Sequence, residues 1–138
     1  MAASYDTVHE SPWRLGWHHL QLSAPEGGEA AARAFWVDIL GFVELTKPPA
    51  LAARGGLWVR ADGLEIHIGI EPGFTPPAKA HPGIVVGDLD GLAARLTSGG
   101  VVVTWDDAFP GMRRFYAFDP FGNRLEFLQP IEGEAATW

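Results

Sequence analysis

The stretch that decides the fold is Asp119–Gln129, which reads Asp-Pro-Phe-Gly-Asn-Arg-Leu-Glu-Phe-Leu-Gln. Its first residues predict a turn, because Pro120 fixes φ at the second position and Gly122 accepts a positive φ. The residues after the turn alternate as in a strand, so Arg124 and Glu126 share one face. A carboxylate at such a position is costly to bury unless another group pairs with it. Glu126 therefore either lies on a solvated face or is paired, and the upstream histidines are the candidate partners.

A pattern of one strand, one helix and three further strands occurs twice along the chain. His19 and His81 each lie at the start of a first strand, 62 residues apart, and Glu65 and Glu126 lie in the last strands, 61 apart. The glycines that end the two helices are 59 residues apart, and the aspartates that open the last turns are 57 apart. Nearly constant spacing of this kind indicates a duplicated unit. The resulting pseudo-twofold symmetry predicts that the first-strand histidines, His19 and His81, and the last-strand glutamates, Glu65 and Glu126, converge on one place.

Apolar periodicity and turn residues give the expected elements. The first half is predicted to have a helix over 29–40 and strands over 17–24, 42–46, 57–60 and 64–70. The second half is predicted to have a helix that begins after Asp88 and ends before 98–100, and strands over 81–87, 101–105, 113–118 and 123–129. We expect one domain, divided into an arm (1–12), a first module (13–72), a proline-rich linker (73–80), a second module (81–130) and a tail (131–138).

Composition limits the classes of function. The 138 residues carry a net charge of −7 with a pI near 5.1, which disfavours nucleic acid and anionic membranes as partners. The chain contains no cysteine, so disulfides, thiolate nucleophiles and cysteine zinc sites are excluded. The first residues have no secretory-signal pattern, and no apolar run is long enough to span a membrane. We therefore expect a cytoplasmic protein.

Four segments together resemble the vicinal oxygen chelate superfamily, which includes glyoxalase I, bleomycin-resistance proteins, extradiol dioxygenases and fosfomycin-resistance thiol transferases. They are His19-Leu-Gln-Leu, Phe35-Trp-Val-Asp-Ile-Leu-Gly41, His81-Pro-Gly-Ile-Val-Val-Gly-Asp88-Leu-Asp90 and Asp119-Pro-Phe-Gly-Asn-Arg-Leu-Glu126. The resemblance implies an α+β fold in which two βαβββ modules form a cupped, mostly antiparallel, eight-stranded mixed sheet around a cavity. It also implies one divalent metal ion held by His19, His81 and Glu126. Two imidazoles and a carboxylate suit Fe, Mn, Ni or Zn and leave positions open for substrate oxygens.

Two residues on one strand face are alternative candidates for a fourth metal ligand. The repeat aligns Glu65 with Glu126, and members of the glyoxalase I group have a carboxylate there that acts as ligand and base. His67 lies two residues further on and is the better ligand for a borderline ion. An isomerase needs a base, for which Glu126 and Glu65 are the catalytic candidates, whereas dioxygenase or transferase chemistry needs no fourth ligand. A solvated strand face remains the alternative for both residues.

Two classes of function fit these features. The first is a metal-dependent enzyme, of the lyase, isomerase, dioxygenase or transferase type, that acts on a small oxygen-bearing molecule. The second is a metal-free protein of the bleomycin-resistance kind that sequesters a planar ligand between aromatic rings. Candidate substrate-binding residues are Trp58, Trp105, Arg114 and Tyr116, although aromatic residues at strand spacing are also typical of a core. We expect a homodimer, because the proline-rich linker lets modules pair within or between chains and many members of the superfamily complete each site across two chains.

Overall fold

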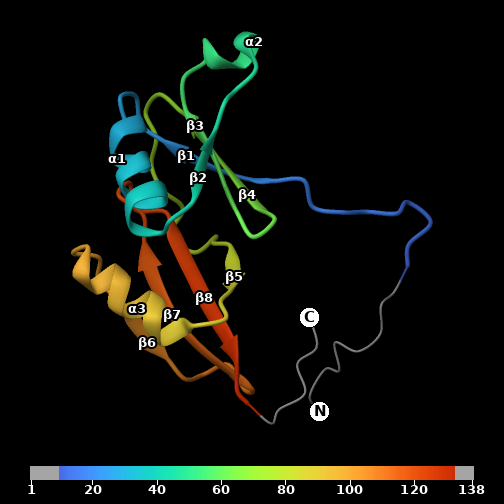
Figure 1. The fold of residues 1–138 in the computed structure, drawn as a ribbon, viewed down its shortest axis with the longest axis vertical. Helices are drawn as coiled ribbons and strands as arrows, with labels where there is room; N and C mark the ends of the chain where they lie inside the picture. Colours follow the sequence, from blue (N-terminus) through green and yellow to red (C-terminus); the bar gives the residue numbers. More distant parts are fainter. Residues whose placement is uncertain (1–9, 133–138) are drawn as a thin grey trace.

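The computed structural model describes residues 10–132 of the chain (Figure 1). The first module contains β1 (Leu20–Ala24), α1 (Glu29–Arg33), the π-helical segment η1 (Ala34–Ile39), β2 (Val43–Leu45), α2 (Pro49–Ala52), β3 (Leu57–Ala61) and β4 (Leu64–Ile70). The second module contains β5 (Gly83–Val85), α3 (Leu89–Ser98), β6 (Thr104–Asp106), β7 (Met112–Phe118) and β8 (Arg124–Pro130). None of the helices in this part of the chain is both long and apolar enough to cross a membrane.

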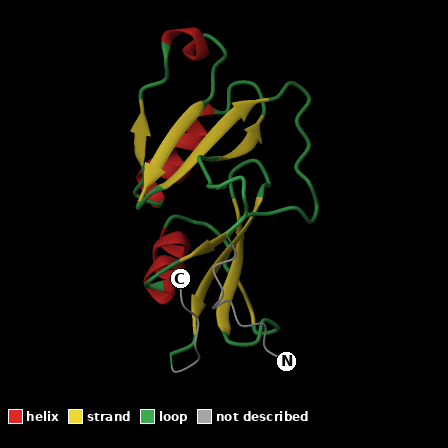
Figure 2. Ribbon diagram, turned by 90° about the vertical axis from the view of Figure 1, so that its right-hand side faces the viewer, coloured by secondary structure: helices red, strands yellow, loops and turns green. Residues whose placement is uncertain are grey.

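Each module folds into its own four-stranded sheet, and the two sheets have the same topology (Figure 2). In the first sheet the order is β1-β4-β3-β2, with β1 parallel to β4 and the other pairs antiparallel. In the second sheet the order is β5-β8-β7-β6, again with only the first pair parallel. The α+β class and the duplicated βαβββ unit are therefore confirmed, and the eight strands are divided equally between two sheets.

The hydrophobic core lies on the helix side of both sheets. Alternate residues of the long strands, such as Ile66 and Phe127, pack there against helix residues such as Trp36 and Leu96. The strand residues between them point to the opposite, helix-free face, as alternation in a strand requires. His67 and Glu126 are on this second face and are nevertheless only 5% and 7% exposed. Two ionisable groups are thus buried away from the apolar core, which makes the helix-free face the candidate location of a functional site.

Polar contacts join the two modules. Asn123 in the β7–β8 turn donates from Nδ2 to the carbonyl oxygen of Ser23, 2.8 Å away at the end of β1. Arg95 of α3 donates from Nε to the carbonyl oxygen of Ile39, at 2.9 Å. The turn itself is held by Asp119, whose Oδ1 accepts from the backbone N–H of Asn123 at 2.8 Å. The Asp-Pro-Phe-Gly-Asn segment thus closes a hairpin and also links the second module to the first.

The structure differs from the sequence prediction in a few places. The first strands begin at Leu20 and Gly83, so both His19 and His81 lie in the extended segments just before them. The predicted helix 29–40 becomes π-helical in its second half, where Leu40 N–H donates to the carbonyl oxygen of Phe35. The predicted loop 47–56 contains the short helix α2, which Pro49 begins because it lacks an N–H that would need a partner. Most of the predicted arm and tail, residues 1–9 and 133–138, lies outside the described residues.

Candidate functional site

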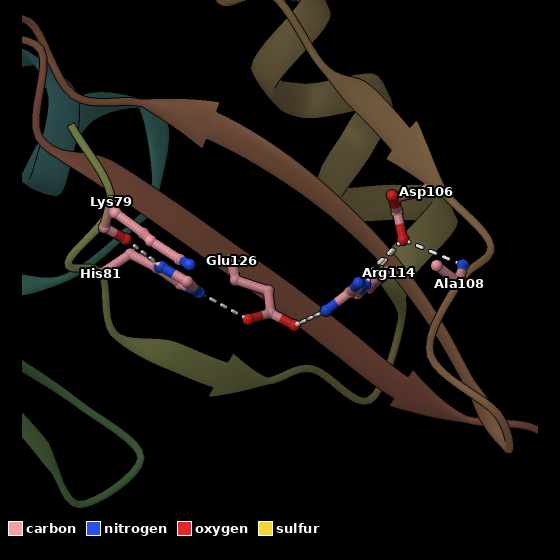
Figure 3. Close-up of polar contacts among 6 residues, drawn as sticks. All are labelled: Lys79, His81, Asp106, Ala108, Arg114 and Glu126. Atoms are coloured by element: carbon pink, nitrogen blue, oxygen red, sulfur yellow. Dashed lines mark hydrogen bonds and ion pairs between the residues drawn. The ribbon is translucent and has the colours of Figure 1, made fainter.

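His81 and Glu126 meet on the helix-free face of the second sheet (Figure 3). His81 Nε2 is 2.9 Å from Glu126 Oε2, and the two residues are 45 positions apart in the sequence. The contact follows from the parallel pairing of β5 with β8, in which Gly83 lies opposite Glu126. Because Gly83 has no side chain, nothing on β5 covers the Glu126 carboxylate. Of the upstream histidines that are candidate partners of Glu126, the one in contact with it is therefore His81.

The other nitrogen of His81 fixes the direction of its ring. His81 Nδ1 is 2.7 Å from the carbonyl oxygen of Lys79, which can only accept a hydrogen bond (Figure 3). Nδ1 must therefore carry a hydrogen. When Nε2 also carries one, it donates to Glu126 Oε2, and when it does not, its lone pair is available to a cation. A backbone carbonyl that accepts from one imidazole nitrogen is the usual way in which a metal-ligating histidine is oriented. The lone pair of Nε2 points toward the same place as Glu126 Oε2.

Arg114 of β7 holds the second oxygen of the Glu126 carboxylate. Its Nη1 donates to Glu126 Oε1 at 3.0 Å, and its Nε donates to Asp106 Oδ1 at 2.9 Å (Figure 3). The hydrogen bonds to the two carboxylates raise the pKa of Arg114 against the opposing effect of burial, the largest single influence. Asp106 is held in turn by the backbone N–H of Ala108, which lowers its pKa. Arg114 therefore positions Glu126 and leaves Oε2 for other contacts.

The equivalent face of the first module carries a column of stacked rings. The ring of His67 lies 4.1 Å from Trp58 at an interplanar angle of 6°, and 3.8 Å from His19 at 12°. Trp58 contacts its other neighbour Lys47 through a cation–π interaction at 5.9 Å. His19 also contacts His18 across 2.9 Å between their Nδ1 atoms. His19 is exposed at the end of this column, whereas His67 is buried within it.

Glu65 and His67, the two candidates for a fourth ligand, are bonded to each other. His67 Nε2 lies 2.7 Å from Glu65 Oε2. Burial lowers the pKa of His67, and the Glu65 carboxylate opposes that shift without reversing it. The ring is therefore neutral at pH 7, donates Nε2–H to Glu65 and keeps its lone pair on Nδ1. This hydrogen bond from His67 in turn lowers the pKa of Glu65.

Strand pairing shows which residues of the two modules are equivalent. Gln21, two residues after His19, pairs with His67, and Gly83, two residues after His81, pairs with Glu126. Across the antiparallel ladder, Trp58 lies opposite His67 and Tyr116 opposite Glu126. His67 thus occupies the position of Glu126, and Glu65 occupies the position of Arg124. The sequence alignment of Glu65 with Glu126 differs because five residues join β7 to β8, whereas two join β3 to β4.

One chain does not bring all of the predicted metal ligands together. His81 and Glu126 touch, but His19 is stacked on His67 in the other module. Within residues 10–132, no three His, Asp or Glu side chains form a group that could hold a metal ion. The donors fit a borderline divalent ion in kind, since two imidazole nitrogens and a carboxylate oxygen are available. A single chain places only two of these three donors side by side.

A cavity of about 740 Å³ lies between the two modules. It is lined by β1 and its approach, by the linker and by the start of β5, and it includes His19, Glu65, His81 and Arg124. Glu126 and His67 are not among its lining residues. The cavity volume is in the range of sites for small molecules. The two predicted first-strand histidines, His19 and His81, therefore line a cavity that suits a small ligand. Their contact partners, His67 and Glu126, are buried and do not line it.

The four predicted substrate-binding residues lie in different surroundings. Trp58 and Tyr116 lie on the helix-free face, opposite His67 and Glu126, and Arg114 lies beside Glu126. Trp105 lies opposite Phe115 in the ladder and packs on its ring at 5.2 Å, on the core side of the sheet and away from Glu126. Arg124 was not among the predicted site residues, although the alternation in β8 places it on the same face as Glu126.

Comparisons with known proteins agree on one family. A model of the Glyoxalase/Bleomycin resistance protein/Dioxygenase superfamily matches residues 16–127. A glyoxalase family protein from Bacillus anthracis is 43% identical over 85% of this chain and 96% of its own, with a TM-score of 0.81. TnmS3, an antibiotic-binding protein from Streptomyces, is 28% identical over 83% and 97%, with a TM-score of 0.63.

A more distant solved structure shares the fold alone. It is a mutant of FosX, a fosfomycin resistance protein from Listeria monocytogenes, in complex with Mn(II), and it is 18% identical over 85% of this chain and 93% of its own, with a TM-score of 0.69. No curated protein matches the chain. The family match includes strands of both modules, and the chain belongs to the Glyoxalase/Bleomycin resistance protein/Dioxygenase superfamily.

Proposed function

We propose that the protein is a divalent-metal-dependent enzyme that acts on a small oxygen-bearing substrate. The observation that carries this proposal is the geometry of His81. Its Nδ1–H is taken by the Lys79 carbonyl oxygen, and its Nε2 lies 2.9 Å from Glu126 Oε2. His81 Nε2 and Glu126 Oε2 can therefore both serve as donors to one ion. A metal bound there would supply Lewis acidity, which polarises a substrate oxygen.

His19 completes the proposed donor set from a second copy of the chain. In one chain His19 stacks on His67 and does not contact His81 or Glu126. A twofold dimer places the first module of each copy against the second module of the other, so that two identical sites form. FosX, which shares this fold, was solved in complex with Mn(II), so the fold is compatible with a bound divalent metal.

Exposed apolar residues support the association of two copies. The segment before β1 carries Trp13, Leu15 and Trp17, which are 77%, 83% and 93% exposed. Three large apolar side chains at alternate positions of one segment are costly to leave in water. Their position directly before His19 places any partner that covers them beside the proposed site. We therefore propose that this segment contacts the second copy.

The residues of the site have distinct proposed roles. Glu126 is both ligand and candidate base, with Arg114 holding its Oε1 atom. Glu65 is a second candidate base, and its partner His67 is a candidate fourth ligand through Nδ1. A carboxylate within hydrogen-bond reach of a substrate C–H beside a carbonyl would carry out the proton transfer of an isomerase. If His67, and not Glu65, is the residue that faces the metal, dioxygenase or transferase chemistry fits better.

Metal analysis tests this proposal directly. Purified protein should contain about one divalent ion per chain after dialysis, and Glu126→Gln should lose most of it because a neutral amide is a poor ligand. Glu132→Gln, which removes the same charge from an exposed position six residues further along, is the matched control. Metal-loaded protein should then turn over a thiohemiacetal, a catechol or an epoxide. Equal metal content in Glu126→Gln and wild type would contradict the proposal.

The column of rings favours a second candidate function, sequestration of a planar ligand. Trp58, His67 and His19 are stacked at 4.1 and 3.8 Å, and the outer face of His19 is exposed. A flat ligand could continue the stack with favourable offset contacts. TnmS3, at 28% identity, is an antibiotic-binding protein, which supports this alternative. Absence of bound metal together with quenching of Trp fluorescence by a planar ligand would favour it over the enzyme.

A further inference from the structure

Arg124 differs from three other arginines of the chain in having no hydrogen-bonded carboxylate partner within residues 10–132. Arg33, Arg113 and Arg114 are bonded to Glu44, Asp90 and Glu126 at 2.8–3.0 Å. Arg124 instead lies over the ring of Tyr116, with its Cζ 4.0 Å from the ring centroid. It is partly buried and lines the cavity of about 740 Å³. Asp106 is near enough for the charge of Arg124 to contribute to its lowered pKa, but within the described residues no carboxylate accepts a hydrogen bond from Arg124, so its donors are available to an anion from outside the chain.

The ring of Tyr116 holds Arg124 beside the candidate catalytic pair. His81 meets the same ring edge-on, with the centroids 5.6 Å apart. Arg114 is also near the ring, at 5.2 Å, but its N–H groups are taken by Glu126 and Asp106. Arg124 is therefore the cation at this place whose donors are not used by carboxylates of the described chain. The cation–π contact restricts the guanidinium and so lowers the entropy lost when a ligand binds.

We propose that Arg124, held on the ring of Tyr116, binds an anionic oxygen group of the substrate, either a carboxylate or a phosphate-like group. The planar guanidinium presents paired N–H donors that match such groups in geometry. A net charge of −7 would otherwise repel an anion, which makes a local cation in the cavity necessary for its recognition. The inference rests on the proposed function, since it names the class of substrate that reaches the His81–Glu126 pair.

Inorganic phosphate is a suitable probe, followed by phosphorus NMR line broadening and by calorimetry. Wild type should bind phosphate in a saturable way, and Arg124→Gln should weaken binding about tenfold or more. Arg124→Lys should recover part of the loss because it keeps the charge without the paired donors. Arg54→Gln removes the same charge from an exposed position and should leave phosphate binding unchanged.

Three results would overturn the inference: no phosphate binding by wild type, equal binding by wild type and Arg124→Gln, or dissociation of a dimer by Arg124→Gln without any phosphate binding. The last result would assign Arg124 to a contact between subunits. Metal content measured on the same samples separates this inference from the proposed function. Arg124-dependent phosphate binding by metal-free wild type supports the anion site even if the metal proposal fails.

Discussion

Replacement of Arg114 by Met should destabilise the metal-free protein by about 2 kcal/mol. Arg114 bonds Glu126 Oε1 at 3.0 Å and Asp106 Oδ1 at 2.9 Å. Asp106 has a side chain that is 36% exposed and can turn to water, so its lost bond costs little. Glu126, whose side chain is 9% exposed, keeps only His81 as a partner. One buried charge-assisted hydrogen bond contributes about 1.5–3 kcal/mol. The loss should stay within that range because Glu126 keeps its contact with His81.

Urea unfolding, followed by Trp fluorescence at one protein concentration in the presence of a chelator, measures this loss. For a slope of about 2 kcal/mol per molar urea, the midpoint should fall by about 1 M. The double variant with Glu126→Gln should be more stable than the sum of the single changes predicts, because it has no unpaired carboxylate. A midpoint within error of wild type, or strictly additive losses, would refute the role of Arg114 as the residue that positions Glu126.

Three further predictions concern the turn, a glycine and the fourth ligand. Burial raises the pKa of Asp119, so the folded state binds the proton of this carboxyl more tightly than the unfolded chain does. The contribution of Asp119 to stability should therefore rise as pH falls through its folded-state pKa. It should be complete below the unfolded-state pKa of about 3.9. The difference between the stability–pH curves of wild type and Asp119→Asn measures it, and an opposite slope would contradict it. Gly56→Ala should cost about 2–4 kcal/mol, because φ is +87° and the new Cβ would clash with the Ile68 carbonyl oxygen, whereas Gly16→Ala, in open space, should be neutral in thermal unfolding. His67→Ala should lower metal affinity while Glu65→Gln leaves it almost unchanged, and the reverse order in metal titrations would assign the fourth position to Glu65.

The sequence was sufficient for the fold and for one contact of the candidate site, that between His81 and Glu126. Period-2 alternation, glycines at turns and matched spacings identified the duplicated module, because strand and turn geometry depends on local residue types. The contact between His81 and Glu126 follows from the same repeat, since a parallel pair of strands brings their starts together. These features are local or depend on one strand pairing, and both are readable from residue order.

The remaining features depend on distances that residue order does not encode. The alignment of Glu65 with Glu126 ignored the different lengths of the last turns, so it missed that the register matches His67 to Glu126. The pairing of Arg114 with Asp106 requires the register of β6 against β7, which a three-residue strand does not specify by pattern. The separation of His19 from His81 depends on how modules associate, and a single sequence contains no direct signal for that.

A mixing experiment with His19→Ala and His81→Ala tests most directly whether two chains share each site. Each variant alone should bind no stoichiometric metal. When equal amounts are unfolded together and refolded, half of the dimers are mixed, and each mixed dimer has one intact site with His19 from one copy and His81 and Glu126 from the other. About one quarter of the wild-type metal content should therefore be recovered. Sites built within one chain, or a protein that holds no metal, would leave the mixture as empty as the separate variants and would contradict it.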